Sequence, residues 1–293
     1  MPNLIVLVGP PGAGKSRLAH SLIYDDGDHG LATTYVNQDA QSKEHLTIFK
    51  NAIAQNRDII VDRMGFSKEQ RQRYIAPAKA AGYSTKIIVL HESKETCTDR
   101  CNSRKDHPTI KTVEDASKAI NFFFSKYERP TLDEADVVDF RYPPGEKPLV
   151  VISDLDNTLC NANHREHFLR KEGKKDWKGF FDAMVEDPIV PEVEETLRMF
   201  NEYYPIVYCS GRPDTYKRIT VDWLYNKVMD FNTHLFMRPR NDSRADTIIK
   251  EIILDFELLT RYTPFVVLDD RDCVVQMWRA RGIKCFQVAP GAF

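Results

Sequence analysis

The chain has no apolar run that approaches the roughly 18 residues a membrane-spanning helix needs, and no tract biased toward one residue type. It also has little excess charge, because 41 basic residues face 43 acidic ones and the two halves share them almost evenly. A general polyanion binder would be strongly basic, so any contact with nucleic acid must come from a local groove. We therefore expect a soluble, cytoplasmic protein (in the host cytoplasm if the source is viral) that contacts no membrane.

Cysteine is sparse as well, with six scattered residues. Cys97 and Cys101 stand four positions apart on a predicted helix, but no second pair completes a zinc site. Free thiols in a reducing compartment are the simpler interpretation.

At 293 residues the chain is long enough for two domains of about 140 residues each. Short β-branched runs alternate with helical patterns, which predicts an α/β fold with parallel sheets, and this alternation occurs twice. The predicted strands cover residues 4–8, 58–61, 86–90, 149–153, 206–210, 265–268 and 284–289. Three prolines and a glycine within residues 141–148 can continue neither helix nor strand. We therefore predict one domain over residues 1–143 and another over residues 148–293.

The first strand runs into Gly9-x-x-x-x-Gly14-Lys15-Ser16, which matches the P-loop pattern in its expected place between a strand and a helix. The glycines let backbone N–H groups turn toward nucleotide phosphates, and the helix N-terminus adds its positive dipole end. Lys15 supplies a charge to the transferring phosphoryl group, and the Ser16 hydroxyl can ligate Mg²⁺. The expected nucleotide-binding residues are Gly9, Gly12, Ala13, Gly14, Lys15, Ser16 and Arg104.

Two carboxylates follow predicted strands beside this loop, one after residues 35–38, which we expect to end a further strand, and one after the strand at residues 58–61. Asp39 is placed to accept the proton of an attacking hydroxyl, with a helix-capping role as the alternative. Asp62 can assist Mg²⁺ or orient the acceptor, and capping of the next helix is equally compatible with its position.

Arg100 and Arg104 lie one helical turn apart, just before the polar residues 105–108. Guanidinium groups on a mobile segment can neutralise charge on the phosphate oxygens. A solvated charged helix face is the alternative.

A second constellation begins halfway along the chain, where Asp154 and Asp156 follow the strand at residues 149–153. One aspartate can attack phosphorus while the other protonates the leaving oxygen and then activates water. Later strand ends and helices offer a hydroxyl, cations and Mg²⁺ ligands, in the order Ser210, Arg212, Lys250, Asp269 and Asp270. We expect Mg²⁺ to be held by Asp154, Asp156, Asp269 and Asp270.

Residues 160–191 leave room only for a small helical cap, which suits the end of a large substrate.

The second constellation resembles the haloacid dehalogenase-type phosphatases. The whole arrangement resembles the bacteriophage-type polynucleotide 5′-kinase/3′-phosphatases, over nearly all the chain and most sharply over residues 268–289. In the kinase half this resemblance implies Lys15 and Ser16 as the P-loop catalytic pair, Asp39 as the base for a 5′-hydroxyl, and Arg104 as the lid arginine. Arg100 and Asp62 would bind substrate.

In the phosphatase half, the resemblance implies Asp154 as the nucleophile and Asp156 as the acid–base. The residues that would complete the site are Arg165, Arg212, Asp246, Lys250, Asp269 and Asp270. One departure concerns the acceptor: the family carries an arginine three residues after its base aspartate, and here that residue is Ser42.

We thus predict a bifunctional end-healing enzyme that uses ATP to phosphorylate 5′-hydroxyl ends of RNA or DNA. It would use Mg²⁺ to remove 3′-phosphates, with 2′,3′-cyclic phosphates as a further candidate substrate. The resulting ends are those that a ligase joins. The alternatives are a kinase–phosphatase of a small metabolite and a nucleotide-gated interaction module without turnover. A homo-oligomer is compatible with the sequence.

Overall fold

The structure, a computed structural model, describes residues 1–293 except 26–32, 105–108, 142–145, 171–174, 229–233 and 292–293. The chain divides into two compact units, Met1–Pro143 and Pro144–Phe293. The predicted breaks at residues 105–108 and 142–145 fall outside the described residues. Within the described part, no helix is long and apolar enough to cross a membrane.

The first unit contains a five-stranded, wholly parallel sheet in the order β2-β3-β1-β4-β5. Its strands are β1 (Asn3–Val8), β2 (Thr34–Asn37), β3 (Ile59–Asp62), β4 (Ser84–Leu90) and β5 (Asp136–Phe140). Its helices are α1 (Lys15–Asp25), α2 (Gln38–Gln41), α3 (His45–Ala54), α4 (Lys68–Ala80), α5 (Lys94–Asn102) and α6 (Val113–Lys126), with a 3₁₀ turn at Ser42–Glu44.

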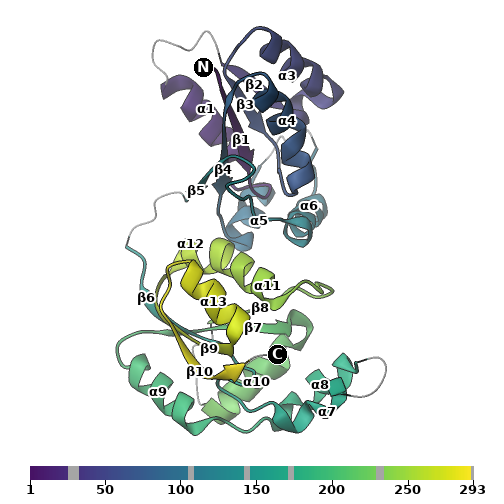
Figure 1. The fold of residues 1–293 in the computed structure, drawn as a ribbon. Helices are drawn as coiled ribbons and strands as arrows, with labels where there is room; N and C mark the ends of the chain where they lie inside the picture. Colours follow the sequence, from purple (N-terminus) through teal and green to yellow (C-terminus); the bar gives the residue numbers. More distant parts are fainter. Residues whose placement is uncertain (26–32, 105–108, 142–145, 171–174, 229–233, 292–293) are drawn as a thin grey trace. The chain divides into compact units, whose positions relative to one another are not determined.

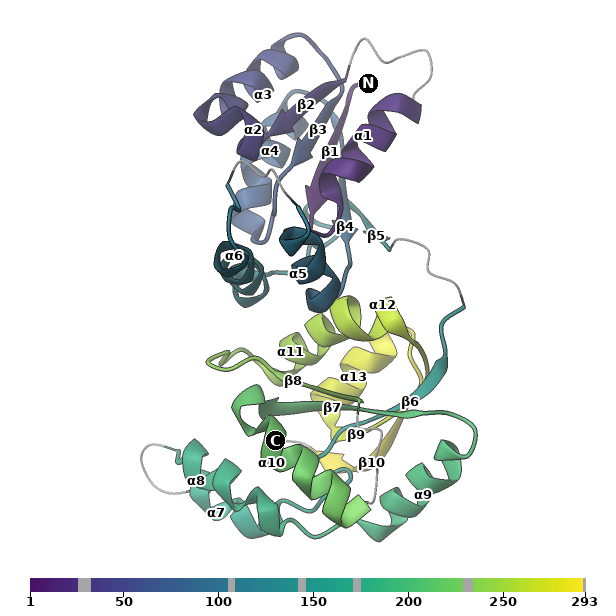
Figure 2. The ribbon, with the colours of Figure 1, turned by 180° about the vertical axis from the view of Figure 1, so that it is seen from behind.

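Helices cover both faces of this sheet, with α1 on one side and α3 and α4 on the other in both views (Figures 1 and 2). The central strand β1 is buried almost throughout, which explains its continuous apolar sequence. A buried ion pair ties α4 to the segment before β5: the Arg71 guanidinium donates to both Glu134 carboxylate oxygens, at 2.9 and 2.7 Å. The same guanidinium also donates to the backbone oxygens of Gly65 and Glu128, so its charge is well partnered.

The second unit contains another parallel five-stranded sheet, in the order β10-β9-β6-β7-β8. Its strands are β6 (Leu149–Ser153), β7 (Ile206–Pro213), β8 (His234–Arg238), β9 (Thr263–Arg271) and β10 (Cys285–Gly291). Its helices are α7 (His167–Arg170), α8 (Trp177–Asp182), α9 (Pro191–Asn201), α10 (Lys217–Trp223), α11 (Asp246–Ile253), α12 (Leu259–Arg261) and α13 (Asp272–Ala280). Shorter 3₁₀ and π-helical turns lie at Asn163–Arg165, Ala183–Glu186, Asp214–Tyr216, Leu224–Val228 and Leu254–Leu258.

Alternate residues of β6 point to opposite faces of the second sheet, as the two-residue period of a strand requires. Val150 and Ile152 pack into a core with residues of α11 and α13, whereas Val151 packs into another core with residues of α9 and α10. The prediction of an α/β fold with two parallel sheets and flanking helices is confirmed. Short helices α7 and α8 lie between β6 and β7, where the sequence predicted a small cap.

Candidate functional site

The first candidate site lies at the carboxyl end of β1, where the P-loop leads into α1. The Lys15 ammonium donates hydrogen bonds to the backbone oxygens of Gly9 and Pro10, both at 2.9 Å. Burial lowers the pKa of Lys15, and the negative charge of Asp62 opposes that shift. The ammonium thus already lies across the loop in which phosphate oxygens would be held.

Gly12 fixes how closely this loop meets helix α5. It has a φ of +85°, and a Cβ atom there would lie only 2.4 Å from the backbone oxygen of Cys97. The Arg100 guanidinium of the same helix donates to the Gly12 backbone oxygen at 3.4 Å and pairs with Glu92 at 2.9 Å. Arg100 therefore lies against the P-loop, with 41% of its side chain exposed, and its role stays a prediction.

Arg104 is exposed and lies two residues beyond the end of α5. Its positive charge is one of the contributions that lower the pKa of Lys15, after the larger effect of burial. Its role as the lid arginine stays a prediction.

The Asp62 carboxylate ends β3 and accepts three hydrogen bonds. The donors are the Ser16 hydroxyl at 2.6 Å, the Tyr35 hydroxyl at 2.6 Å and the Asn37 amide at 3.2 Å. Burial, together with the bond to Asp62, raises the pKa of Tyr35 to about 12. Asp62 does not cap the next helix, because Ser67 occupies the N-cap of α4. A hydroxyl and a carboxylate side by side at this loop are oxygen ligands of the kind that Mg²⁺ takes.

Asp39 is exposed in the first turn of α2, which follows strand β2. Strand β2 pairs with β3, and β3 pairs with β1, the strand that leads into the P-loop. The N-cap of α3 is Glu44 and that of the preceding 3₁₀ turn is Gln41, so the alternative that Asp39 caps the helix after it is wrong. Asn37 is the N-cap of α2, where its side chain accepts from the Ala40 backbone. The Thr109 hydroxyl donates to Asp39 at 3.3 Å. Ser42, three residues on, has a φ of +47°, an uncommon conformation for a residue with a side chain. Asp39 as a base stays a prediction.

The second candidate site lies at the carboxyl ends of β6 and β9, which pair in the middle of the second sheet. Carboxylate oxygens of Asp154, Asp269 and Asp270 lie within 4.8 Å of one another, and all three residues are buried. The Lys250 ammonium of α11 lies 3.1 Å from Asp154 and 2.8 Å from Asp269. The Thr158 hydroxyl donates to Asp270 at 3.3 Å.

The electrostatics of this carboxylate group fit a divalent cation. Burial raises the pKa of Asp154 well above its ordinary value, with Lys250 opposing the shift and Asp269 adding to it. Burial and the neighbouring Asp269 raise the pKa of Asp270 to about 6. Burial and the neighbouring negative charge thus disfavour ionisation of Asp154 and Asp270, and a bound Mg²⁺ would relieve the repulsion.

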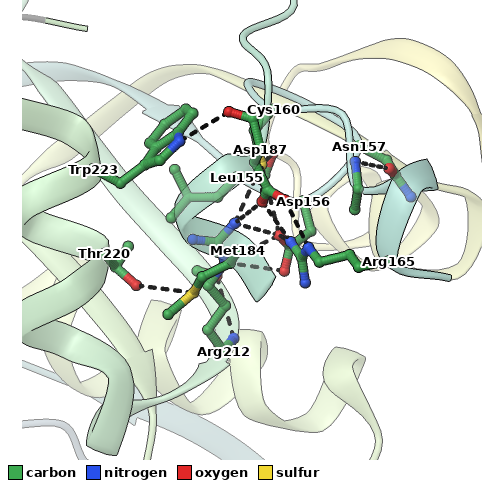
Figure 3. Close-up of polar contacts among 12 residues, drawn as sticks. Leu155, Asp156, Asn157, Cys160, Arg165, Met184, Asp187, Arg212, Thr220 and Trp223 are labelled. Atoms are coloured by element: carbon green, nitrogen blue, oxygen red, sulfur yellow. Dashed lines mark hydrogen bonds and ion pairs between the residues drawn. The ribbon is translucent and has the colours of Figure 1, made fainter. Parts of the chain in front are cut away.

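Asp156 does not join that group. Its carboxylate accepts from Arg212 Nε at 3.0 and 3.2 Å, and from a terminal nitrogen of Arg165 (Figure 3). Burial alone would raise the pKa of Asp156, but the two arginines outweigh it and hold that pKa well below its usual range. The expectation that all four carboxylates converge on one cation is therefore wrong for the Asp156 side chain, because two guanidiniums attract it away.

Asp187 lies behind both arginines and was not identified from the sequence. Its buried carboxylate accepts from Arg165 at 2.8 and 2.7 Å, from Arg212 at 2.9 Å and contacts His164 at 2.8 Å. The Trp223 indole donates to the Asp187 backbone oxygen at 3.0 Å (Figure 3). The aspartates expected to hold Mg²⁺ were predicted because each follows a predicted strand. Asp187 follows none, so the sequence did not indicate it.

We predict that Asp187→Ala weakens the phosphatase site through the two arginines. Removing one partner of a buried charge cluster costs about 3–5 kcal/mol of unfolding free energy. We expect a lower melting temperature for the second unit and a KM for phosphate ester raised at least about tenfold, because the guanidiniums lose their orientation. Asp182→Ala, at an exposed carboxylate of α8 paired with Lys178, is the matched control. An unchanged KM in Asp187→Ala would contradict the positioning role.

The remaining predicted residues lie in β7 and α11. Ser210 is fully buried, and its hydroxyl accepts from the Arg212 backbone at 3.2 Å. Asp246, at the start of α11, lies 3.7 Å from Lys250 and 3.1 Å from Arg238. The structure thus places the predicted phosphatase residues in two groups, one around Asp154, Asp269 and Lys250 and the other around Asp156, while their individual roles stay predictions.

Comparison with known proteins bears on both units. The model of the polynucleotide kinase PNKP phosphatase domain matches residues 148–293. Through this half, the chain belongs to the PNKP phosphatase-domain family. A model of an AAA domain matches residues 4–126, ahead of the PNKP-type half.

Two curated relatives have names that state two activities. A protein of Autographa californica nuclear polyhedrosis virus, named for bifunctional polynucleotide kinase and RNA ligase activities, is 24% identical over 94% of this chain and 41% of its own length. The bifunctional polynucleotide phosphatase/kinase of Schizosaccharomyces pombe is 29% identical over 45% of this chain and 31% of its own length. The chain therefore spans less than half of either relative.

Among solved structures, a chain of the Pnkp1/Rnl/Hen1 RNA repair complex is similar over 100% of this chain and 97% of that one. Its sequence identity is 24% and its TM-score 0.43.

Proposed function

We propose that this chain is a two-site enzyme that heals nucleic-acid ends. One unit would transfer the γ-phosphate of ATP to a 5′-hydroxyl of RNA or DNA, and the other would hydrolyse a 3′-phosphate. The observation that carries the proposal is the geometry of the second site. There, three buried carboxylates cluster with a buried lysine, and Asp156, two residues after Asp154, is paired with two arginines, in a unit that belongs to the PNKP phosphatase-domain family.

In the phosphatase unit, an Asp154 oxygen would attack phosphorus and form an aspartyl-phosphate, while the bond from phosphorus to the 3′ oxygen breaks. Asp156 would give its proton to the departing 3′ oxygen and later take a proton from the attacking water. Arg165, Arg212 and Lys250 are the cations available to the phosphate oxygens. Mg²⁺, held by Asp154, Asp269 and Asp270, would neutralise negative charge on phosphate and nucleophile.

Asp156 can serve as an acid only when its two arginines turn from it to an incoming phosphate. In the free enzyme both guanidiniums hold the carboxylate ionised. A phosphate dianion competes for them, and their withdrawal would raise the Asp156 pKa toward that of a proton donor.

In the kinase unit, the P-loop backbone and Lys15 would hold the ATP phosphates, and Arg100 and Arg104 would neutralise charge on them. Ser16 and Asp62 are suited to the nucleotide's Mg²⁺. Asp39 would take the proton from the 5′-hydroxyl.

The test uses RNA and DNA oligonucleotides that carry a 5′-hydroxyl and a 3′-phosphate, with both termini scored after incubation with ATP and Mg²⁺. We expect a 5′-phosphate and a 3′-hydroxyl, and loss of both reactions when Mg²⁺ is chelated. A sugar alcohol and its phosphate monoester serve as small-molecule controls. Turnover of those controls without turnover of the oligonucleotides would contradict nucleic acid as the substrate. No turnover of any compound would contradict an enzymatic role.

The products of the two reactions define the partner we propose. A 5′-phosphate beside a 3′-hydroxyl is the pair of ends that a ligase seals, so the enzyme would act before a ligase. A ligase assay on doubly healed and unhealed nicks measures this dependence.

A further inference from the structure

The cap of the phosphatase unit carries an aromatic cluster that the proposed chemistry does not use. Trp177 begins α8, and its side chain remains half exposed. Its ring stacks on Phe181, with centroids 5.9 Å apart and planes 22° from parallel. Phe180 presents its edge to the same indole at 6.0 Å.

Exposure of one tryptophan is ordinary on a protein surface and by itself indicates nothing. The position of this cluster is what distinguishes it. The Phe180 ring packs against the Arg165 guanidinium, with the Arg165 Cζ atom 4.2 Å from the ring centroid. Since Trp177 contacts Phe180, its ring lies within about 10 Å of that guanidinium, by the two centroid distances. A single ring, that of Phe180, thus separates the half-exposed indole from an arginine that we propose binds phosphate.

The aromatic cluster also contacts the 3₁₀ turn that follows β7, the strand of Arg212. Phe181 contacts Tyr216 at 5.2 Å, and Tyr216 lies in the turn directly after β7, the strand that carries Arg212. Contacts between aromatic rings therefore run from Phe180, which packs on Arg165, to Tyr216, which follows the strand of Arg212.

Packing holds α8 in place. A Cβ atom at Gly179 would lie 2.6 Å from the Phe168 ring of α7, so the two cap helices meet as closely as a glycine allows. Asp176 caps α8 by accepting from the Gly179 backbone at 2.9 Å. The Lys175 ammonium lies over the Trp177 ring, 5.7 Å from its centroid, and adds a positive charge there.

From this arrangement we propose that Trp177 is the stacking platform for the base of the nucleotide that carries the 3′-phosphate. The phosphate would enter between Arg165 and Arg212, and its own base would lie on the exposed indole, with Lys175 adding charge that favours a polyanionic strand. Aromatic side chains stack on any base, so this subsite would favour nucleotide ends without choosing a sequence. The inference rests on the proposed phosphatase function and assigns the part of the substrate that the cap binds.

The experiment compares two single-stranded oligonucleotides with 3′-phosphates that differ only in the last nucleotide, which is intact in one and abasic in the other. Phosphate release by the full chain is measured for the wild type, Trp177→Ala and Trp177→Phe. We expect Trp177→Ala to raise the KM for the intact end roughly 10-fold to 100-fold, with kcat nearly unchanged. We expect its KM for the abasic end to equal that of the wild type, and Trp177→Phe to keep most of the preference for the intact end. Tyr203→Ala, at a more exposed aromatic side chain before the amino end of β7, is the matched control.

Three outcomes would overturn the platform while leaving the phosphatase in place: no change in Trp177→Ala, an equal loss on both oligonucleotides, or a loss confined to kcat. An equal loss would mean that Trp177 supports the fold of the cap and does not contact the base. If the wild type releases phosphate from neither oligonucleotide, the proposed function fails, and the platform fails with it.

Discussion

Asp154→Asn should abolish phosphate release from 3′-phosphate ends while ATP-dependent labelling of 5′-hydroxyl ends continues at the wild-type rate. A carboxamide has nearly the shape of the carboxylate but cannot form the aspartyl-phosphate, so we expect a loss on the order of 10⁴-fold or more. The residue lies 3.1 Å from Lys250 and contributes one of the three clustered carboxylates. Its replacement therefore removes the nucleophile and leaves the proposed Mg²⁺ a neutral amide oxygen in place of a charged ligand.

The measurement is inorganic phosphate released from the oligonucleotide, with label transfer to a 5′-hydroxyl recorded on the same preparation. Asp222→Asn is the matched control, because it makes the same chemical change at an exposed carboxylate of α10 in the same unit. If Asp154→Asn kept more than a tenth of the phosphatase rate, another group would have to be the nucleophile.

Lys15→Ala should have the opposite effect and eliminate 5′-phosphorylation while phosphate release continues. The ammonium is the charge nearest the loop in which the ATP phosphates would lie, and it bonds to the Gly9 and Pro10 oxygens. We expect a loss of about 10³-fold or more in transfer rate, since phosphoryl transfer depends on positioning and charge stabilisation. The two loop oxygens also lose their donor, so a modest fall in the melting temperature of the first unit should accompany the loss.

Lys50→Ala, at an exposed lysine of α3, controls for the loss of a lysine from the same unit. Loss of both activities in either Lys15→Ala or Asp154→Asn would argue against two independent sites.

The sequence was most informative where chemistry follows a buried strand. Asp154 and Asp269 come directly after apolar runs, and parallel strands end at the same sheet edge, so their convergence could be predicted. The P-loop could be predicted for the same reason, because its glycines and lysine lie between a buried strand and a helix.

The sequence was less informative where a partner comes from a distant segment. Asp187 lies between the cap and α9, and only the fold shows that it holds Arg165 and Arg212. Tyr35 and Asn37 likewise reach Asp62 from a neighbouring strand. Strands β5 and β8 were not predicted, because each lies at an edge of its sheet and carries exposed or half-buried polar residues in place of a continuous apolar run.

The close approach of Gly12 to Cys97 also limits how this protein can diverge. No residue larger than glycine fits between the loop and the backbone of α5, and few others adopt the φ of +85°. A homologue with any other amino acid at this position must have displaced α5, and Arg100 with it. We therefore expect a substitution in the nucleotide-binding loop at this position to occur only together with substitutions that move α5, so the loop and the helix should change together among homologues.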